Sequence, residues 1–414
     1  MRVEIPYGKQ IFSVEIEQSR VAGVFTGNDV TIGGADESIR QGISAPLNSR
    51  SLADFINNAR DLLFIVNDAT RPTPTARILE NIFRVARPVN PKFLVATGNH
   101  IAPTEAEYRQ IFGRFYEEYK TQIFAHSSRA DADLVSIGTS RNKTPLSVNR
   151  RAMEAKDLIV ISSVEPHYFA GYTGGRKSLF PGISSFKSIE MNHSHAMSPQ
   201  SAALALEGNP VHEDMVDALQ AFRAKNIFAV MTVLDKYQRV YSTTAGHIND
   251  SFYAAVEHAR EVFVVKVKEK ADIVVTVTRA PLDINLYQSQ KALEHGKLAL
   301  KEGGIIILVS CCRGGIGDDT FVRLLNSCSK PEDVFNYIKQ GYKLGYHKAA
   351  KLAEMNRWSE VWAVTDLPDA LLKSIFIHPY HSLQTALNNA LEKKGQNARV
   401  FFFLDGAMTV PVLD

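Results

Sequence analysis

The stretch SLADFINNARDLLFIVND, residues 51–68, decides the fold class of this chain. Its first ten residues have the pattern of a helix, and residues 61–68 form a continuous apolar run that ends in Asn-Asp. A strand that is apolar without alternation is typical of a parallel sheet covered by helices. The stretch therefore predicts one helix–strand repeat of an α/β domain.

The same alternation of helix and strand continues on both sides of this stretch. Further helices are expected over 74–85 and 104–112, and buried strands over 92–98 and 157–163. Residues 2–16 alternate apolar and polar side chains around a Tyr-Gly-Lys turn, which predicts a short β-hairpin. The first part of the chain is thus expected to form an α/β domain with a mainly parallel sheet.

A second α/β unit follows in the sequence. It is indicated by the apolar strands ADIVVTV (271–277) and GIIILVS (304–310), with a helical segment between them. We predict an N-terminal domain over 1–260 and a C-terminal domain over 268–378. The tail, about 385–414, is expected to return to the first domain. Residues 261–270 are interpreted as a linker or crossover between the two domains.

Composition limits the classes of function that need to be considered. A chain of 414 residues is too long for one typical domain, and its net charge of +3 does not favour nucleic acid or a membrane surface as a partner. The three cysteines lack metal-ligand spacing and are expected to be reduced thiols. No apolar run approaches the ~18 residues of a membrane helix. We therefore expect a soluble cytoplasmic protein.

Polar residues follow three of the predicted strands. Asp68 and Arg71 come after the first, His100 after the second and His167 after the third. In open α/β sheets, ligands bind beyond the carboxyl ends of the strands, so these four side chains converge if the strands are neighbours. An imidazole titrates near ~6.5, which suits general acid–base catalysis. The pattern predicts a catalytic or binding site at this edge.

The segment Pro166–His193 holds a Gly-rich turn followed by a basic pair. Gly174 and Gly175 could bring backbone N–H groups close to an anion, with Lys177 supplying the charge. The turn is not a Walker A loop, because Arg176 separates the last glycine from the lysine. No G-x-G-x-x-G motif joins a strand to a helix, so a dinucleotide site is not supported.

Two further groups of side chains are suited to hold an anionic ligand. Arg71 lies in a proline-rich loop and could bind a carboxylate with two hydrogen bonds, although it could instead pair locally with Asp68. Tyr287, Gln288 and Lys291 lie one helical turn apart after a loop that ends a strand. They are interpreted as ligand contacts, and the alternative is an ordinary solvated helix face.

Several motifs together resemble those of the nickel-dependent lactate racemase family. They occur in order and span most of the chain: NDATRPTP (67–74), TGNH (97–100), HYFAGYTGGRKSLFPGI (167–183), NH (192–193), GNPVHED (208–214) and LYQSQKAL (286–293). The resemblance implies two α/β domains with cofactor and substrate in the cleft between them. The implied cofactor is a nickel-pincer nucleotide, a pyridinium mononucleotide that holds the metal through sulfur and a ring carbon.

The resemblance also implies roles for individual residues. Lys177 is similar to the lysine that carries the cofactor through a thioamide, and His193 is similar to the protein ligand of nickel. His100 and His167 match the two catalytic histidines. The remaining cofactor contacts are assigned to Asp68, Thr70, Gly174 and Gly175. Substrate contacts, chiefly with the carboxylate, are assigned to Arg71, Tyr287, Gln288 and Lys291.

The activity implied by the resemblance is inversion of C2 in a 2-hydroxy acid. Removing the C2 hydrogen as a proton would place a second charge beside the carboxylate, whereas removing it as hydride gives a planar 2-keto acid. One histidine takes the hydroxyl proton for each enantiomer, and the metal-bound pyridinium accepts the hydride. The implied partners are a small 2-hydroxy acid and the cofactor-biosynthesis proteins, and a homo-oligomer is compatible with the sequence.

The chain departs from the family pattern at a few positions. Asn99 stands where threonine is frequent, and Tyr168 follows the second catalytic histidine where proline is frequent. Trp358 and Trp362 both lie downstream of the position of the family's second-domain tryptophan, and residues 346–347 fall in that region instead. We therefore expect racemase or epimerase chemistry on a 2-hydroxy acid that need not be lactate.

Two alternative functions remain open at the level of the sequence. The first is a zinc or nickel hydrolase with His100, His167 and His193 as metal ligands. The second is a non-enzymatic protein that binds a phosphorylated metabolite through the Gly-rich turn and Lys177.

Overall fold

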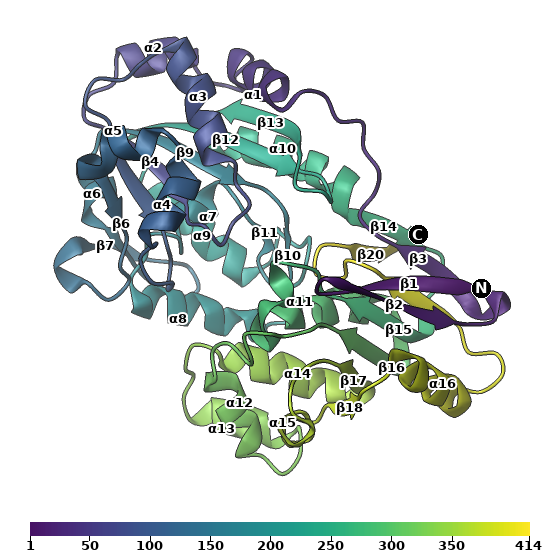
Figure 1. The fold of residues 1–414 in the computed structure, drawn as a ribbon. Coiled ribbons are helices and arrows are strands. Elements are labelled where there is room, and N and C mark those ends of the chain that lie inside the picture. The colour runs from purple at the N-terminus through teal and green to yellow at the C-terminus, as the bar shows by residue number, and fades with distance from the viewer. The chain divides into compact units, whose positions relative to one another are not determined.

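The computed structural model describes residues 1–414, which form two compact units (Figure 1). The central unit is Asp29–Val262. The terminal unit combines both ends of the chain, Met1–Asn28 and Phe263–Asp414. Both units are α/β with mainly parallel sheets, so the predicted fold class is confirmed. None of the helices has both the length and the apolar character needed to cross a membrane.

This division differs from the boundaries expected from the sequence. The C-terminal strand β19 (Val400–Phe403) pairs with β15 (Ala271–Val277) and with β3 (Val21–Phe25), all within the terminal unit. The tail therefore does not return to the first domain, and the first 28 residues join the second one instead. The expected linker forms β14 (Val264–Val267), which pairs in parallel with β20 (Val410–Leu413).

The central unit is built on a six-stranded sheet in which only one edge strand, β13, is antiparallel. The strand order across the sheet is β13 (Val240–Gly246), β12 (Asn226–Leu234), β9 (Asp157–Ser163), β4 (Leu62–Asn67), β5 (Lys92–Ala96) and β6 (Ile123–Ala125). Two hairpins stand apart from the sheet: β7 (Leu134–Thr139) with β8 (Pro145–Asn149), and β10 (Pro166–His167) with β11 (Gly171–Tyr172).

Helices of the central unit cover the sheet. Their bounds are α1 (Ala35–Ser44), α2 (Leu52–Asn57), α3 (Thr75–Val85), α4 (Glu105–Phe112), α5 (Phe115–Tyr119), α6 (Arg150–Glu154), α7 (Arg176–Leu179), α8 (Phe186–Ser194), α9 (Pro210–Gln220) and α10 (Ile248–Phe263). Helices α1 to α5 pack on one face, where Phe64, Val66 and Val230 join their apolar side chains in a buried cluster. Met231 faces the other way and contacts Gly175, at the start of α7.

The terminal unit has a second sheet, and all six of its strands are parallel. Its order is β18 (His378–Tyr380), β17 (Glu360–Val364), β16 (Leu300–Val309), β15, β19 and β3. The predicted hairpin is present as β1 (Arg2–Tyr7) and β2 (Gln10–Glu15). The helices are α11 (Leu286–Gly296), α12 (Thr320–Asn326), α13 (Asp333–Gln340), α14 (Tyr346–Trp358), α15 (Asp369–Ser374) and α16 (Leu383–Lys394).

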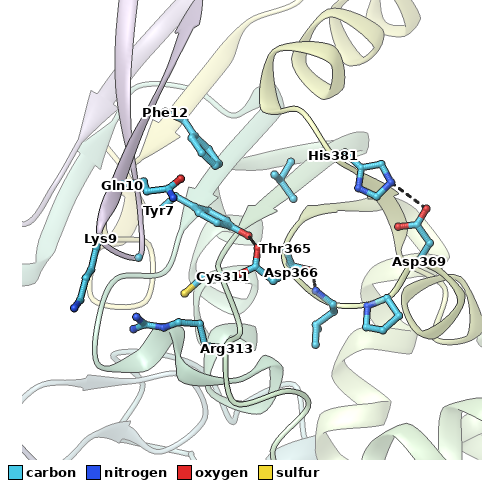
Figure 2. A pocket seen from close by; sticks show the side chains of 14 residues that line it. Tyr7, Lys9, Gln10, Phe12, Cys311, Arg313, Thr365, Asp366, Asp369 and His381 are labelled. Atoms are coloured by element: carbon cyan, nitrogen blue, oxygen red, sulfur yellow. Dashed lines mark hydrogen bonds and ion pairs between the residues drawn. The ribbon is translucent and has the colours of Figure 1, made fainter.

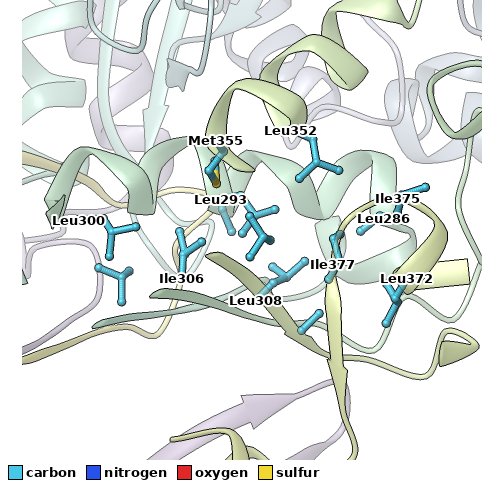
Figure 3. Close-up of a cluster of buried hydrophobic side chains, with 14 of the residues drawn as sticks. Leu286, Leu293, Leu300, Ile306, Leu308, Leu352, Met355, Leu372, Ile375 and Ile377 are labelled. Carbon is cyan, nitrogen blue, oxygen red and sulfur yellow. The ribbon is translucent and has the colours of Figure 1, made fainter. Parts of the chain in front are cut away.

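The two faces of this sheet pack against different elements. Ile306 and Leu308 of β16 meet Leu293 of α11 and Leu352 of α14 in one buried cluster (Figure 3). The alternate residues of the same strands face a second cluster, formed with α16 and the β1–β2 hairpin. Because both faces of the inner strands β15, β16, β17 and β19 are largely buried, their apolar runs in the sequence do not alternate.

One buried histidine of the central unit makes stability depend on pH. The His126 ring is 1% exposed. Its Nε2 lies 2.9 Å from the Ser184 carbonyl oxygen, and its Nδ1 lies 3.3 Å from the Asn149 amide nitrogen, so the neutral ring donates to one and accepts from the other. Burial lowers the pKa of His126 to about 4. The folded state therefore holds this ring neutral at pH values where the unfolded chain would be protonated.

We expect the free energy of unfolding to fall as the pH drops from about 6.5, the ordinary histidine pKa, toward about 4. In that window His126 binds a proton in the unfolded chain but stays neutral in the native state. This lowers the free energy of unfolding by about 1.4 kcal/mol per pH unit for this group. Denaturant unfolding of wild type and His126→Gln across the window checks this. The variant cannot take the proton, so its slope against pH should be smaller; equal slopes would contradict the prediction.

Candidate active site

The carboxyl ends of three neighbouring strands bring the predicted residues of the central unit together. Strand β4 pairs with β9 on one side and with β5 on the other, as the convergence expected from the sequence requires. The Thr73 hydroxyl lies 2.8 Å from Asn67 Oδ1, at the end of β4, and 2.9 Å from Ser163 Oγ, at the end of β9. The loops that follow these strands therefore share one polar edge.

His100 and Asp68 form a dyad on this edge. His100 Nδ1 lies 2.7 Å from Asp68 Oδ2, and the Thr70 hydroxyl donates to Asp68 Oδ1 at 2.6 Å. Burial alone would raise the pKa of Asp68, but the hydrogen bonds from His100 and from the Thr70 hydroxyl outweigh it and lower that pKa. The carboxylate is thus ionised and accepts the Nδ1 proton. The Nε2 lone pair of His100, whose side chain is 49% exposed, is left to act as a base.

Arg71 is held by a carboxylate that the sequence analysis did not single out. Its Nη1 lies 3.1 Å from Glu165 Oε1, so its ion pair is not the local one with Asp68. Only the Arg71 backbone N–H donates to Asp68, through the carbonyl oxygen at 3.2 Å. Glu165 follows β9 by two residues, and its place after a strand end was the available sequence indication. The pair fixes one side of the guanidinium and leaves further donors on the same group.

His167 has the opposite tautomer preference from His100. It lies in β10 and is 8% exposed, and its Nδ1 accepts the backbone N–H of Ala170 at 3.3 Å. A neutral ring that accepts at Nδ1 carries its proton on Nε2. His167 therefore presents an N–H donor where His100 presents a lone pair. This difference arises because the backbone of the short β10–β11 hairpin brings an N–H group to His167. The sequence does not indicate that hydrogen bond.

His193 lies near His167, with one aromatic side chain between the two rings. The Phe169 ring centroid is 4.5 Å from that of His167 and 5.2 Å from that of His193, edge-on in both cases. Burial, followed by the charge of Lys177, lowers the pKa of His193 to about 3. His193 is thus a neutral imidazole, the form that binds a metal ion.

The segment that contains Lys177 is also tied to the strand ends. The Gly98 backbone N–H, two residues before His100, donates to the Gly182 carbonyl oxygen at 2.8 Å. The Asn67 amide lies 3.4 Å from the Ser178 hydroxyl, directly after Lys177. These bonds connect the His100 loop with α7, so His100, His167, Lys177 and His193 belong to one connected region of the central unit.

The Gly-rich turn is shaped by close packing within the protein. A Cβ at Gly174 would lie 2.8 Å from the Ser163 carbonyl oxygen, and one at Gly175 would lie 2.9 Å from Met231 Cε. The Gly175 backbone N–H donates to the Ser162 hydroxyl at 3.0 Å. Both glycines have positive φ angles, +87° and +54°. The turn therefore needs glycine for its conformation and packing, and the Gly175 amide is already used inside the protein.

In the terminal unit, Tyr287, Gln288 and Lys291 lie at the beginning of α11. The side chain of Asn285 caps this helix by accepting the Gln288 backbone N–H at 2.9 Å. Lys348 of α14, which the sequence analysis passed over, donates to the Tyr287 carbonyl oxygen at 2.7 Å and lies 4.5 Å from the centre of the Tyr287 ring. Burial, with the nearby charge of Lys291, lowers the pKa of Lys348 well below its usual range. The sequence indicated the helix face but not this neighbour on another helix.

The aromatic side chains of the terminal unit serve mainly in packing. Trp362 is 4% exposed and packs against Tyr380, with ring centroids 4.9 Å apart, in the cluster that faces α16. Tyr287 packs against the other cluster of the same sheet. His347, which is 1% exposed, has its Nδ1 2.8 Å from the Tyr342 hydroxyl. Trp362 therefore serves the core of the unit, on the opposite side of the sheet from Tyr287.

A separate pocket of about 690 Å³ opens at the carboxyl ends of β16 and β17. It is lined by Tyr7 and Lys9 of the hairpin turn, by Cys311 and Arg313 after β16, and by Asp366 after β17 (Figure 2). The Tyr7 hydroxyl points at Asp366 and donates to its carboxylate. None of the residues assigned to the site lines this pocket.

The described side chains do not form a self-sufficient metal site. No group of three or more His, Cys, Asp or Glu side chains is arranged to hold a metal ion. The three-histidine hydrolase considered above requires such a group. Any metal at His193 would need most of its ligands from another molecule.

Comparisons with known proteins agree with one another. Residues 7–204 match the family model for the lactate racemase N-terminal domain, and residues 265–411 match that for the lactate racemase C-terminal domain. The chain is 31% identical to a lactate racemase of Thermoanaerobacterium thermosaccharolyticum, with 99% of this chain and 98% of the relative covered. It is 29% identical to a lactate racemase of Lactiplantibacillus plantarum, with 98% of each covered.

Solved structures give the same result. The lactate racemase apoprotein of Thermoanaerobacterium thermosaccharolyticum superposes with a TM-score of 0.92 at 30% identity, and all of both chains is covered. A protein from Thermotoga maritima shares the fold, with a TM-score of 0.70 at 16% identity over 93% of this chain and 100% of the other.

Proposed function

Because the chain belongs to the lactate racemase family, we propose that it inverts the C2 centre of a 2-hydroxy acid with a nickel-pincer nucleotide carried on Lys177. As a member of this family it is an isomerase. The observation that carries the proposal is the opposite protonation of two histidines in one region. His100 offers a lone pair at Nε2, and His167 offers an N–H at Nε2.

The residues present fit the proposed cofactor. His193 is neutral and lies near the Lys177 amine, which is the chemistry expected of a metal ligand beside a covalent anchor. The chain would supply His193 to the metal, and the remaining ligands would come from the nucleotide. Asp68 and Thr70 are proposed to line the nucleotide. When bound, this group supplies an acceptor for the C2 hydrogen, which no side chain can provide.

The histidines are proposed to handle the hydroxyl proton. His100 Nε2 takes it from one enantiomer, and Asp68 stabilises the imidazolium that forms. His167 Nε2–H returns a proton to the carbonyl oxygen, and the two rings exchange roles in the reverse direction. Arg71, held by Glu165, is proposed to bind the substrate carboxylate. Tyr287, Gln288 and Lys291 of α11 are proposed as further substrate contacts.

Neither alternative gains support from a specific observation. A hydrolase would need three imidazoles around one metal, and His167, whose Nδ1 accepts the Ala170 backbone N–H, carries its proton on Nε2 and so has no ring lone pair left for a metal. A phosphate-binding turn would need free backbone amides, and that of Gly175 donates to Ser162.

The proposal is tested by incubating cofactor-loaded protein in D2O with single enantiomers of a panel of 2-hydroxy acids, lactate included. We expect at least one acid to racemise while its C2 hydrogen is retained, because that hydrogen does not pass through solvent. Chiral chromatography with mass spectrometry measures both quantities. Incorporation of deuterium at C2 at the rate of inversion would indicate proton abstraction and contradict the proposal.

A further inference from the structure

Asp214 of α9 is a fully buried carboxylate outside the residues assigned so far, with an exposed fraction of 0%. Its Oδ1 accepts from the Ser140 hydroxyl at 2.6 Å and from the Asn142 amide at 3.1 Å. Its Oδ2 accepts from the Thr144 hydroxyl at 2.6 Å and from the Asn192 amide at 3.0 Å. One side chain therefore joins α9 to the tip of the β7–β8 hairpin and to α8.

Two of the groups in this network flank His193 in the sequence. Asn192 precedes it, and the Asn192 amide also donates to the Val211 carbonyl oxygen at 3.0 Å. His195 follows it, with Nε2 3.0 Å from Thr144 Oγ1 and 3.6 Å from Asp214 Oδ2. The Thr144 hydroxyl proton is directed to Asp214, so its oxygen is free to accept from His195 Nε2–H. The end of α8 is thus fixed on both sides of His193.

The chemistry of the network argues for a role in orientation. Removing a carboxylate from water is unfavourable unless its lone pairs are satisfied, and here four side-chain donors satisfy them. Apolar contacts could join α8 to α9 without this penalty, but they would not set the rotation of α8 about its axis. Directional hydrogen bonds do fix the rotation of α8, and they thereby fix the direction in which the His193 side chain projects from the helix.

We propose that Asp214 is a positioning residue that fixes the His193 imidazole for metal binding. The inference rests on the proposed function, because it takes His193 as the protein ligand of nickel. Groups that orient a metal ligand change metal affinity by about 10- to 100-fold when they are removed. The effect should therefore appear in how firmly the metal is held, apart from any effect on folding.

The test measures the rate at which cofactor-loaded protein loses nickel to a chelator, for wild type, Asp214→Asn and Thr144→Val. We expect Asp214→Asn to release nickel at least about 10-fold faster, with the nucleotide still attached to Lys177 by mass spectrometry. Thr144→Val removes one donor and the bridge to His195, so its effect should be smaller but in the same direction. If Asp214→Asn does not fold, Thr144→Val decides the question.

Asp235→Asn is the matched control. Asp235 is another buried carboxylate of the central unit, 5% exposed, which accepts from the backbone of Tyr237 and from Arg239 in the turn after β12. It should lower the unfolding midpoint without changing nickel release. Nickel release at the wild-type rate in the folded Asp214 and Thr144 variants, or equally fast release in Asp235→Asn, would overturn the inference alone. Wild-type protein that never holds nickel would overturn the proposed function and the inference with it.

Discussion

Replacing His100 by alanine should lower the turnover of cofactor-loaded protein by about 10³-fold, because a positioned general base contributes roughly 10²–10⁴-fold. The His100 side chain is 49% exposed, and its hydrogen bond joins it to Asp68 at the edge of the sheet and not to the core, so the unfolding midpoint should change little. Steady-state rates on the active enantiomers, measured beside thermal unfolding, check both parts. The loss should appear mainly in kcat, since Arg71 and not His100 is proposed to hold the substrate carboxylate.

His247→Ala provides a matched control within the same unit. His247 Nδ1 lies 2.8 Å from Asp250 Oδ2, and its side chain is also 49% exposed. Removing this second His–Asp pair should leave turnover unchanged. Asp68→Asn should lower turnover as well, and the double variant of Asp68 and His100 should be hardly worse than His100→Ala, because the two act as one unit. Additive losses, or similar losses in the control, would contradict the assignment of the dyad.

The sequence was sufficient for most elements of the central unit and for the edge where its site lies. Continuous apolar runs give buried strands, and polar residues that follow such runs lie at the carboxyl edge. Thus the sequence places Asp68, His100 and His167 after strand ends, and they converge if the strands are neighbours; the structure has β9, β4 and β5 side by side. The capping box of α4, Thr104 with Glu107, shows how local chemistry marks a helix start.

Strand partners could not be obtained in the same way. Residues 400–403 form a strand in the structure, but nothing in the sequence indicates which sheet edge this strand joins. The structure pairs β19 with β15 and β3, which changes the domain boundaries at both ends of the chain. The error arose because a parallel sheet can be extended by any buried strand, so the partner depends on the path of the whole chain.

Polar contacts between residues far apart in the sequence could not be predicted either. Glu165 and Arg71 are 94 residues apart, and Lys348 and Tyr287 are 61 apart, so no local pattern connects them. The glycines illustrate the converse case. Gly174 and Gly175 were interpreted as an anion cradle because glycine permits close approach, and the structure places Ser163 and Met231 against these residues. A glycine in the sequence indicates that another group approaches the backbone closely, but it does not show whether that group belongs to the protein or to a ligand.

Gly171 also lies close to another backbone segment. Among the substitutions proposed for this protein, replacing Gly171 should lower the free energy of unfolding most. Its φ is +75°, and an added Cβ would lie 2.2 Å from the backbone oxygen of Ala205. The Leu204 backbone N–H also donates to the Gly171 carbonyl oxygen at 3.2 Å, so the two segments are held together. Gly171 pairs with His167 in the β10–β11 hairpin. A side chain here would force backbone apart and shift a proposed catalytic residue.

We therefore expect Gly171→Ala to lower the free energy of unfolding by about 4 kcal/mol, near the upper end for single substitutions, and to reduce turnover. Gly208→Ala separates the causes, because Gly208 has nearly the same φ, +72°, but no atom within 4 Å of the added Cβ. It should lose only the roughly 1–2 kcal/mol of a left-handed alanine. Denaturant unfolding of both variants measures the two losses in free energy of unfolding. Their difference is the contribution of the close approach of residues 171 and 205. Equal losses would mean that conformation alone requires glycine at position 171, and that the contact with Ala205 relaxes without penalty.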